Sequence, residues 1–216
     1  MSEVADRLAQ VRERIAAAAR AAGRAPEEVQ LVAVSKEVDA NAVAAAAAAG
    51  QHDFGENRAQ ELAAKAVVLD HDELDLAWHF IGRLQRNKIK TIAARVALWQ
   101  SVDRLELGTE IARHAPGARV LVQVNVAGEE QKGGCAPGAA PALVDELRSA
   151  GLSVGGLMTV PPLAGDPRPY FAALRELAAH LGLATLSMGM SGDFEAAIAE
   201  GATVVRVGRA VFGSRG

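Results

Sequence analysis

The chain has 216 residues, of which 50% are hydrophobic and only 4% aromatic, with a formal net charge of −3. A core of Ala, Val and Leu favours helices packed on buried strands over an aromatic-rich β-sandwich, and the charge balance argues against a general nucleic-acid binder. The single cysteine, Cys135, excludes an intramolecular disulfide and a cysteine-based zinc site, so we expect no metal site.

The N-terminal stretch predicts an amphipathic helix, because Val4, Leu8, Val11 and Ile15 recur at helical spacing before Gly23. This stretch is charged and lacks the apolar core of a signal peptide, and no run approaches the roughly eighteen apolar residues of a membrane span. We therefore expect a cytoplasmic protein without membrane contact. We also expect a monomer, although no sequence pattern determines the oligomeric state.

Short β-branched runs then alternate with longer stretches rich in Ala, Leu and Glu. The predicted strands are residues 31–35, 52–54, 78–81, 97–100, 119–124, 155–158, 184–187 and 204–207. The predicted helices lie near residues 40–49, 56–69, 84–95, 103–115, 139–150, 168–181 and 192–200.

Eight strand–helix repeats predict a parallel sheet, and we expect one α/β domain over residues 1–216, a (β/α)8 TIM barrel with an extra N-terminal helix. The repeats are short for a closed barrel, which usually takes about 250 residues, but the loops are minimal. An open doubly wound sheet is the competing fold.

Polar and glycine residues gather where the predicted strands end, which is where barrel enzymes keep their chemistry. Lys36 closes the run LVAVSK and would share a strand face with Val32 and Val34. Loss of hydration there favours the neutral amine, a nucleophile for carbonyl groups. A lysine that reaches solvent past the strand end is the more ordinary interpretation.

The stretch from Ser187 to Asp193 follows the seventh predicted strand, and Gly208 and Arg209 follow the eighth. Barrels frequently bind phosphate with these two loops, through backbone N–H groups and a helix N-terminus. Ser187 and Ser191 could add hydroxyl donors and Arg209 a charge. The alternative is a pair of glycine turns in which Ser191 or Asp193 caps a helix.

Arg206 lies within a strand that otherwise reads as core, where an arginine needs a carboxylate or a ligand. Asn57 could donate to a ligand or cap the second predicted helix, and for Glu56 and Glu61 a helix-end or solvent role is at least as plausible as chemistry. His79 is best explained as a core histidine with its hydrogen bonds satisfied.

Three further groups have ordinary explanations. The basic residues at the start of the third predicted helix would form a solvated face, and their role stays open: Arg83, Arg86, Lys88 and Lys90. Trp99 should pack in the core. Met158 ends a strand and is included among the ligand-binding candidates, although packing is its more ordinary role.

Six segments together resemble the YggS/PROSC family of pyridoxal phosphate homeostasis proteins: VAVSK, FGENRAQE, WHFIGRLQRNK, GLMTV, LSMGMSGDFEAAIAEG and RVGRAVFG. The resemblance covers essentially the whole chain. It implies a barrel like the N-terminal domain of alanine racemase, which holds pyridoxal 5′-phosphate through a Schiff base on Lys36.

The same resemblance implies that Arg206 faces the pyridine nitrogen and that Asn57 lies beside the ring. It places Ser187, Ser191, Gly208 and Arg209 around the phosphate, although many family members carry Thr at the position of Arg209. The loop EEQKGGC, residues 129–135, is close to a family turn.

Because the pKa of an arginine is about 12, its side chain stays protonated at neutral pH and can only donate a hydrogen bond to the ring nitrogen. The ring nitrogen would then stay unprotonated, which makes the ring a poor electron sink. We therefore expect a carrier for vitamin B6 homeostasis without catalytic residues, whose partners are the cofactor and apo-enzymes that accept it. An amino-acid racemase or lyase is the alternative, although the single tyrosine, Tyr170, leaves it without an obvious second base. A cofactor-free Schiff-base aldolase is the third hypothesis.

Overall fold

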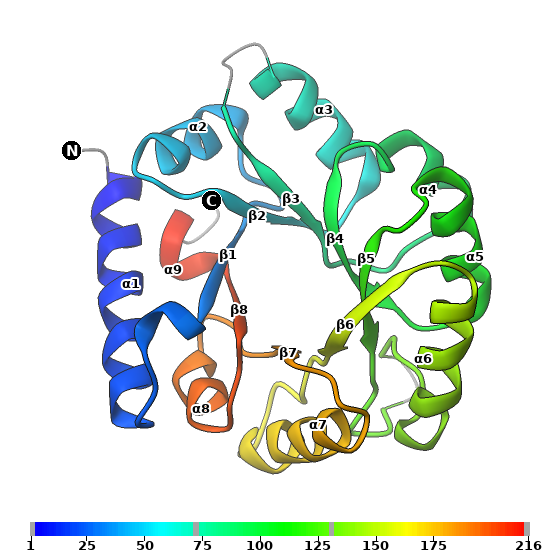
Figure 1. The fold of residues 1–216 in the computed structure, drawn as a ribbon. Coiled ribbons are helices and arrows are strands. Elements are labelled where there is room, and N and C mark those ends of the chain that lie inside the picture. Colours follow the sequence, from blue (N-terminus) through cyan, green and yellow to red (C-terminus); the bar gives the residue numbers. More distant parts are fainter. Residues whose placement is uncertain (1–2, 71–73, 130–131, 214–216) are drawn as a thin grey trace.

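A computed structural model describes residues 3–70, 74–129 and 132–213 (Figure 1). Eight parallel strands close into a barrel in chain order, and β8 pairs with β1. The strands are β1 (Gln30–Val34), β2 (Asp53–Glu56), β3 (Ala77–Phe80), β4 (Val96–Val102), β5 (Arg119–Gln123), β6 (Ser153–Met158), β7 (Thr185–Ser187) and β8 (Val204–Val207). The predicted closed barrel is confirmed, and the open sheet is excluded.

Helices surround the barrel (Figure 1). They are α1 (Glu3–Ala21), α2 (Ala40–Ala48), α3 (Ala59–Asp70), α4 (Arg86–Ile92), α5 (Leu105–His114), α6 (Ala140–Ser149), α7 (Arg168–His180), α8 (Phe194–Ala199) and α9 (Arg209–Phe212), with short 3-10 turns at Pro26–Glu28 and Pro137–Ala139. The helix predicted from residue 56 begins at Ala59, because Glu56 still pairs with Phe80 of β3. No helix in the described part of the chain is long and apolar enough to cross a bilayer.

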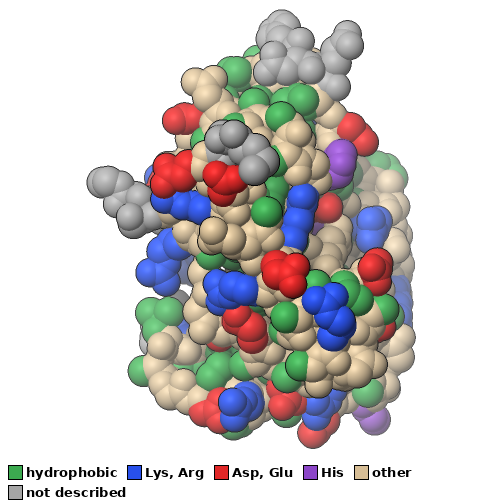
Figure 2. Space-filling model, turned by 90° about the vertical axis from the view of Figure 1, so that its left-hand side faces the viewer, with side chains coloured by type: hydrophobic (Ala, Val, Ile, Leu, Met, Phe, Trp, Pro, Cys, Tyr) green, Lys and Arg blue, Asp and Glu red, His purple; other side chains and the backbone are tan. Residues whose placement is uncertain are grey.

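The extra N-terminal helix takes the place of a missing outer helix. The helix after β8, α9, is only four residues long, and the sequence patterns did not predict it. α1 lies against α2, α8 and α9 and buries Leu8, Val11, Ile15 and Ala19 (Figure 1). The face of the molecule on this side carries both signs of charge (Figure 2). Arg14 of α1 pairs with Glu195 of α8 at 2.5 Å.

The strands alternate between the helix layer and the barrel interior. Leu31 and Ala33 belong to the core shared with the helices. Val32 and Val34 are buried but outside that core, and their methyl groups lie 3.1 and 3.5 Å from where a Cβ on Gly55 would stand. They therefore face the interior, as predicted for the strand face that ends at Lys36.

Candidate functional site

The carboxyl ends of the strands meet at one rim of the barrel, and the predicted site residues follow several of them. Lys36 comes two residues after the end of β1, between Asn57 after β2 and Gly208 after β8. Its side chain is half-buried and has no hydrogen-bond or ion-pair partner among the described residues. An amine held at the rim without a partner is available to a ligand.

The backbone on both sides of Lys36 is fixed by α3. The Ser35 carbonyl accepts a hydrogen bond from Lys65 Nζ at 2.5 Å, and the Glu37 N–H donates to the Glu61 carboxylate. Glu37 has a φ of 60°, a left-handed conformation that residues other than glycine seldom adopt. Because α3 holds both flanking peptide groups, it fixes the direction in which Lys36 leaves the turn.

A buried ion pair lies beneath this turn. Lys65 Nζ is 2.7 Å from Oε1 of Glu56 and 2.7 Å from Oε1 of Glu61, and the Ser35 hydroxyl also donates to Glu56 Oε1 at 2.7 Å. Burial raises the pKa of Glu56, and the hydrogen bonds from Lys65 and Ser35 only partly oppose it. The solvent or helix-end role expected for Glu56 is wrong, because this residue ends β2 and is fully buried.

Arg206 is a buried cation inside the barrel. Its Nη1 donates to Ser187 Oγ at 2.7 Å and its Nη2 to the Thr159 carbonyl at 2.8 Å, and no carboxylate pairs with it within residues 3–70, 74–129 and 132–213. Burial lowers the pKa of Arg206 to about 10, with a smaller opposing effect from Asp193. The ordinary explanation offered by the sequence, a salt bridge, is therefore not found in the described part of the chain.

A chain of hydrogen bonds crosses the barrel from Arg206. Ser187 Oγ donates to Gln100 Oε1 at 2.6 Å, and Gln100 Nε2 lies 2.7 Å from His79 Nδ1. His79 Nε2 lies 3.0 Å from Asp53 Oδ1 at the amino end of β2. Both nitrogens of His79 have partners, which confirms the satisfied core histidine. Ser187 uses its hydroxyl inside the barrel to hold Arg206.

The two loops predicted to bind phosphate lie together. Ser191 Oγ is 3.5 Å from the Ala210 N–H in α9, and the Arg206 N–H donates to the Gly189 carbonyl at 2.9 Å. Gly189 has a φ of 92°, and a Cβ there would lie 2.7 Å from Ala197 Cβ. The structure thus brings Ser191 beside the Gly208–Arg209 turn, while Arg209 is exposed.

The remaining predicted residues are distributed more widely. Asn57 is half-buried, and no side-chain hydrogen bond to cap α3 is found among the described residues. Met158 is 1% exposed and packs with Leu98 and Leu121 in the barrel interior. Trp99 packs against Phe80, with ring centroids 6.0 Å apart. Residues 130–131 of the loop 129–135 lie outside the described residues.

Sequence reasoning missed Lys65 and Gln100. Lys65 falls in the buried stripe of α3 with Leu62, Ala66 and Leu69, and a lysine at such a position signals a buried partner. Gln100 was noted only as one member of a polar strand end. Its role depends on Ser187, 87 residues further along the chain, which no local pattern reveals.

Known proteins similar to this chain indicate one family and one fold. Residues 7–216 match the family model described as alanine racemase, N-terminal domain. The chain is 48% identical over its full length to the pyridoxal phosphate homeostasis protein of Pseudomonas aeruginosa, 97% of which is covered.

Solved structures agree with this match. PipY of Synechococcus elongatus, with PLP bound, superposes with a TM-score of 0.85 at 36% identity, over 98% of this chain and all of that one. Alanine racemase of Corynebacterium glutamicum superposes with a TM-score of 0.71 at 18% identity, over 97% of this chain and 61% of the racemase. The second likeness concerns the fold alone.

Proposed function

Because the chain belongs to the pyridoxal phosphate homeostasis proteins, within the alanine racemase N-terminal domain family, we propose that it holds pyridoxal 5′-phosphate reversibly on Lys36. In this role it limits free cofactor aldehyde and passes the cofactor to apo-enzymes that need it. It is a carrier, and it does not turn over a substrate.

The observation that carries this proposal is the isolated charge of Arg206. A buried guanidinium without a carboxylate is costly unless a ligand supplies an acceptor. A pyridine nitrogen is a neutral acceptor of the right chemistry, and Lys36 at the same rim supplies the amine for the aldehyde. The residues therefore fit the cofactor.

The same arginine favours binding over catalysis. Bound pyridoxal phosphate acts as an electron sink, most strongly when its ring nitrogen is protonated. With a pKa of about 10, Arg206 keeps its proton near neutral pH and can only donate a hydrogen bond to the ring. Ser187 and Thr159 hold the guanidinium in place for that contact.

The other assignments are part of the proposal. Ser191, Gly208 and Arg209 surround the phosphate, supported by the approach of their two loops. Ser187 is proposed to act through Arg206, because its hydroxyl already has two partners. Asn57 and Met158 border the ring. We also propose a cytoplasmic monomer with one domain, for which light scattering at micromolar concentration is the test of the oligomeric state.

Reduction of the loaded protein with borohydride, followed by peptide mass spectrometry, tests the attachment. The label should lie on Lys36, should disappear in Lys36→Arg, and should persist in Lys90→Arg, a change at an exposed lysine. Labelling distributed over surface lysines in the native protein would refute the assignment. Absence of any visible chromophore would instead favour a cofactor-free aldolase.

Two assays separate the carrier from the racemase or lyase. Mixing the loaded protein with an apo-enzyme that depends on pyridoxal phosphate should restore activity faster than free release of the cofactor allows. Incubation with D- and L-amino acids in deuterated water should give no exchange of the α-proton at turnover rates. Rapid exchange of the α-proton would refute the carrier function.

A further inference from the structure

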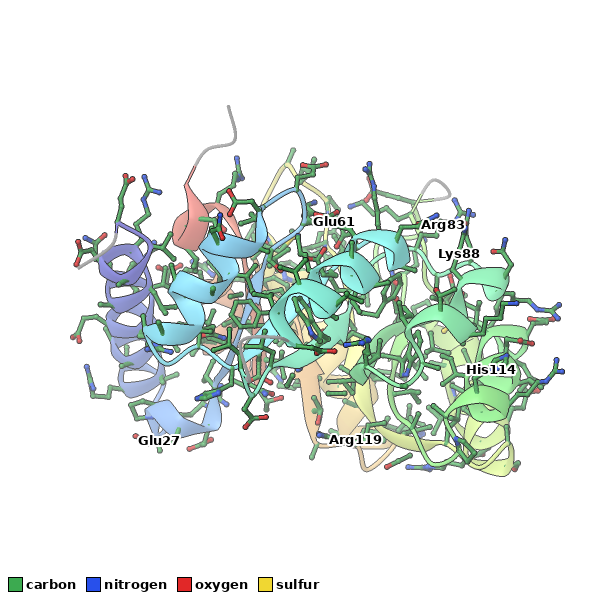
Figure 3. All side chains as sticks on the ribbon, turned by 90° about the horizontal axis from the view of Figure 1, so that it is seen from above. Glu27, Glu61, Arg83, Lys88, His114 and Arg119 are labelled. Carbon is green, nitrogen blue, oxygen red and sulfur yellow. The ribbon has the colours of Figure 1, made fainter. Side chains whose placement is uncertain are left out.

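A cleft of about 180 Å³ lies at the rim between the starts of α3 and α4. Six polar side chains line it: Arg58, Arg83, Lys88, Asn57, Gln60 and Gln85. Arg83, in the loop before α4, and Lys88, in the first turn of α4, lie near each other on the side of the cleft opposite the end of α3 that carries Glu61 (Figure 3). The cleft therefore holds three cations and three amides but no acidic lining residue.

The three cations have no counter-charge in the described ranges. None of Arg58, Arg83 and Lys88 forms an ion pair there, and the adjacent Arg86 reaches Glu110 only at 3.9 Å. Several arginines elsewhere on the surface pair with carboxylates, as in Arg14–Glu195, Arg95–Asp70 and Arg175–Glu200, whereas Arg113 and Arg119 form no ion pair in the described part of the chain. The cleft thus concentrates positive charge that the protein itself does not neutralise.

The backbone beneath the cleft is rigidly assembled. A Cβ on Gly82 would lie only 2.1 Å from the Asn57 carbonyl oxygen, so glycine lets the loop after β3 approach the loop after β2 this closely. The Ser101 hydroxyl donates to the Gly82 carbonyl at 2.6 Å and fixes the loop from the other side. The first turn of α3, with its partial positive charge, lines the same space.

We propose that this cleft binds a phosphate monoester dianion, at a site separate from the loops that we propose for the phosphate of the stored cofactor. Guanidinium groups match phosphate oxygens in pairs, and three unpaired cations suit a dianion better than a carboxylate. The volume is below the roughly 300 Å³ of a pocket for a drug-sized ligand, which suits a phosphate group with few attached atoms.

The position of the cleft gives the site a role. The cleft follows β2 and β3, the Ser191 and Gly208 loops follow β7 and β8, and Lys36 follows β1 between them. A cofactor whose phosphate first docks in the cleft reaches Lys36 from the side opposite its final phosphate loops. This step rests on the proposed function, whereas the binding of phosphate in the cleft does not.

The direct test is calorimetric titration of inorganic phosphate into the protein after its cofactor has been fixed to Lys36 with borohydride. One phosphate should bind, and its affinity should fall at least about tenfold in Arg58→Gln/Arg83→Gln/Lys88→Gln, since each lost contact is charge-assisted. The control, Lys90→Gln/Arg113→Gln/Arg119→Gln, removes the same charge from three exposed cations outside the cleft and should change the affinity less than about twofold.

If the protein takes up no cofactor, the same titration of the untreated protein still decides the matter, so failure of the proposed function is distinguishable. Slower cofactor loading in the cleft variant, with unchanged final loading, supports docking of the incoming cofactor. Unchanged loading with lost phosphate binding supports the site with free phosphate as its occupant. Absence of phosphate binding, or equal binding in the cleft variant and the control, overturns the proposal.

Discussion

Removing the charge of Arg206 should cost the cofactor-free protein less stability than its burial suggests, although the side chain is only 4% exposed. The change to test is Arg206→Met, which keeps an unbranched apolar side chain in the barrel. The expected result follows from two opposing effects, the burial of an unpaired charge and the loss of its hydrogen bonds.

Burial lowers the pKa of Arg206 from the usual value of an arginine to about 10. At about 1.4 kcal/mol for each tenfold change, this corresponds to a penalty of roughly 3 kcal/mol that Arg206→Met relieves. Against it stand two hydrogen bonds from a charged donor, to Ser187 and Thr159, each worth about 1.5–3 kcal/mol. The two effects leave a net loss between about 0 and 3 kcal/mol, so we expect Arg206→Met to lower the free energy of unfolding by less than about 3 kcal/mol.

Lys65→Met is the matched comparison, because Lys65 is also a buried cation but has carboxylate partners. Its removal leaves Glu56 buried and unpaired, which should cost about 3–5 kcal/mol. Urea unfolding of the cofactor-free variants measures both quantities. Equal destabilisation by the two changes would refute the argument that the buried, unpaired charge of Arg206 destabilises the folded protein.

The same titrations with cofactor present give a second readout. A ligand at a hundred times its Kd stabilises the folded protein by about 2.7 kcal/mol. The native protein should gain stability with added pyridoxal phosphate, and Arg206→Met should gain much less at the same concentration. An undiminished gain would show that Arg206 does not contact the cofactor.

Three further predictions concern other parts of the barrel. Burial raises the pKa of Glu56 in the folded protein, so the native protein loses stability as the pH rises from about 4.5 through this raised pKa. Glu56→Gln has no such carboxylate, so its free energy of unfolding in urea titrations should rise relative to that of the native protein over this pH range. Burial raises the pKa of the Cys135 thiol to about 11, so iodoacetamide at pH 8 should react at least about 100-fold more slowly than with free cysteine, and a fast reaction would contradict this burial. In Gly82→Ala the new methyl group would meet the Asn57 carbonyl, so we expect a loss of about 1–3 kcal/mol in thermal unfolding and weaker phosphate binding in the cleft, whereas a native-like melting temperature would argue against the close approach.

The sequence predicted the barrel well, because short apolar runs, β-branched in β1, β5 and β8, alternate with longer stretches of helical composition. It did not predict α9, because four residues are too few for a periodicity. It also began the helix after β2 three residues early, since Glu56 resembles a helix-start residue until its pairing with Phe80 is known. Such boundaries are decided by neighbouring strands.

The site was predicted in part. The position of Lys36 at a strand end and the unusual place of Arg206 within a strand were visible locally, and their common rim follows from the barrel. The side chains that position these two residues could not be predicted from the sequence. Lys65 acts on the Lys36 turn from 29 residues away, and Gln100 holds Ser187 across the barrel, so both contacts exist only after the chain has closed.

The pairing of β1 with β8 has a consequence for how the barrel folds. Residues 30–33 of the first strand find their partners at residues 204–207, more than 170 residues further along the chain. Contacts of such large sequence separation form late and slowly, because the loop entropy must be overcome first. Lys36 follows the first strand and Arg206 lies in the last, so the two halves of the proposed site meet only at this seam. The proposed site stays incomplete until the last strand of the barrel joins the first, so cofactor capture is expected to report completed folding of the barrel.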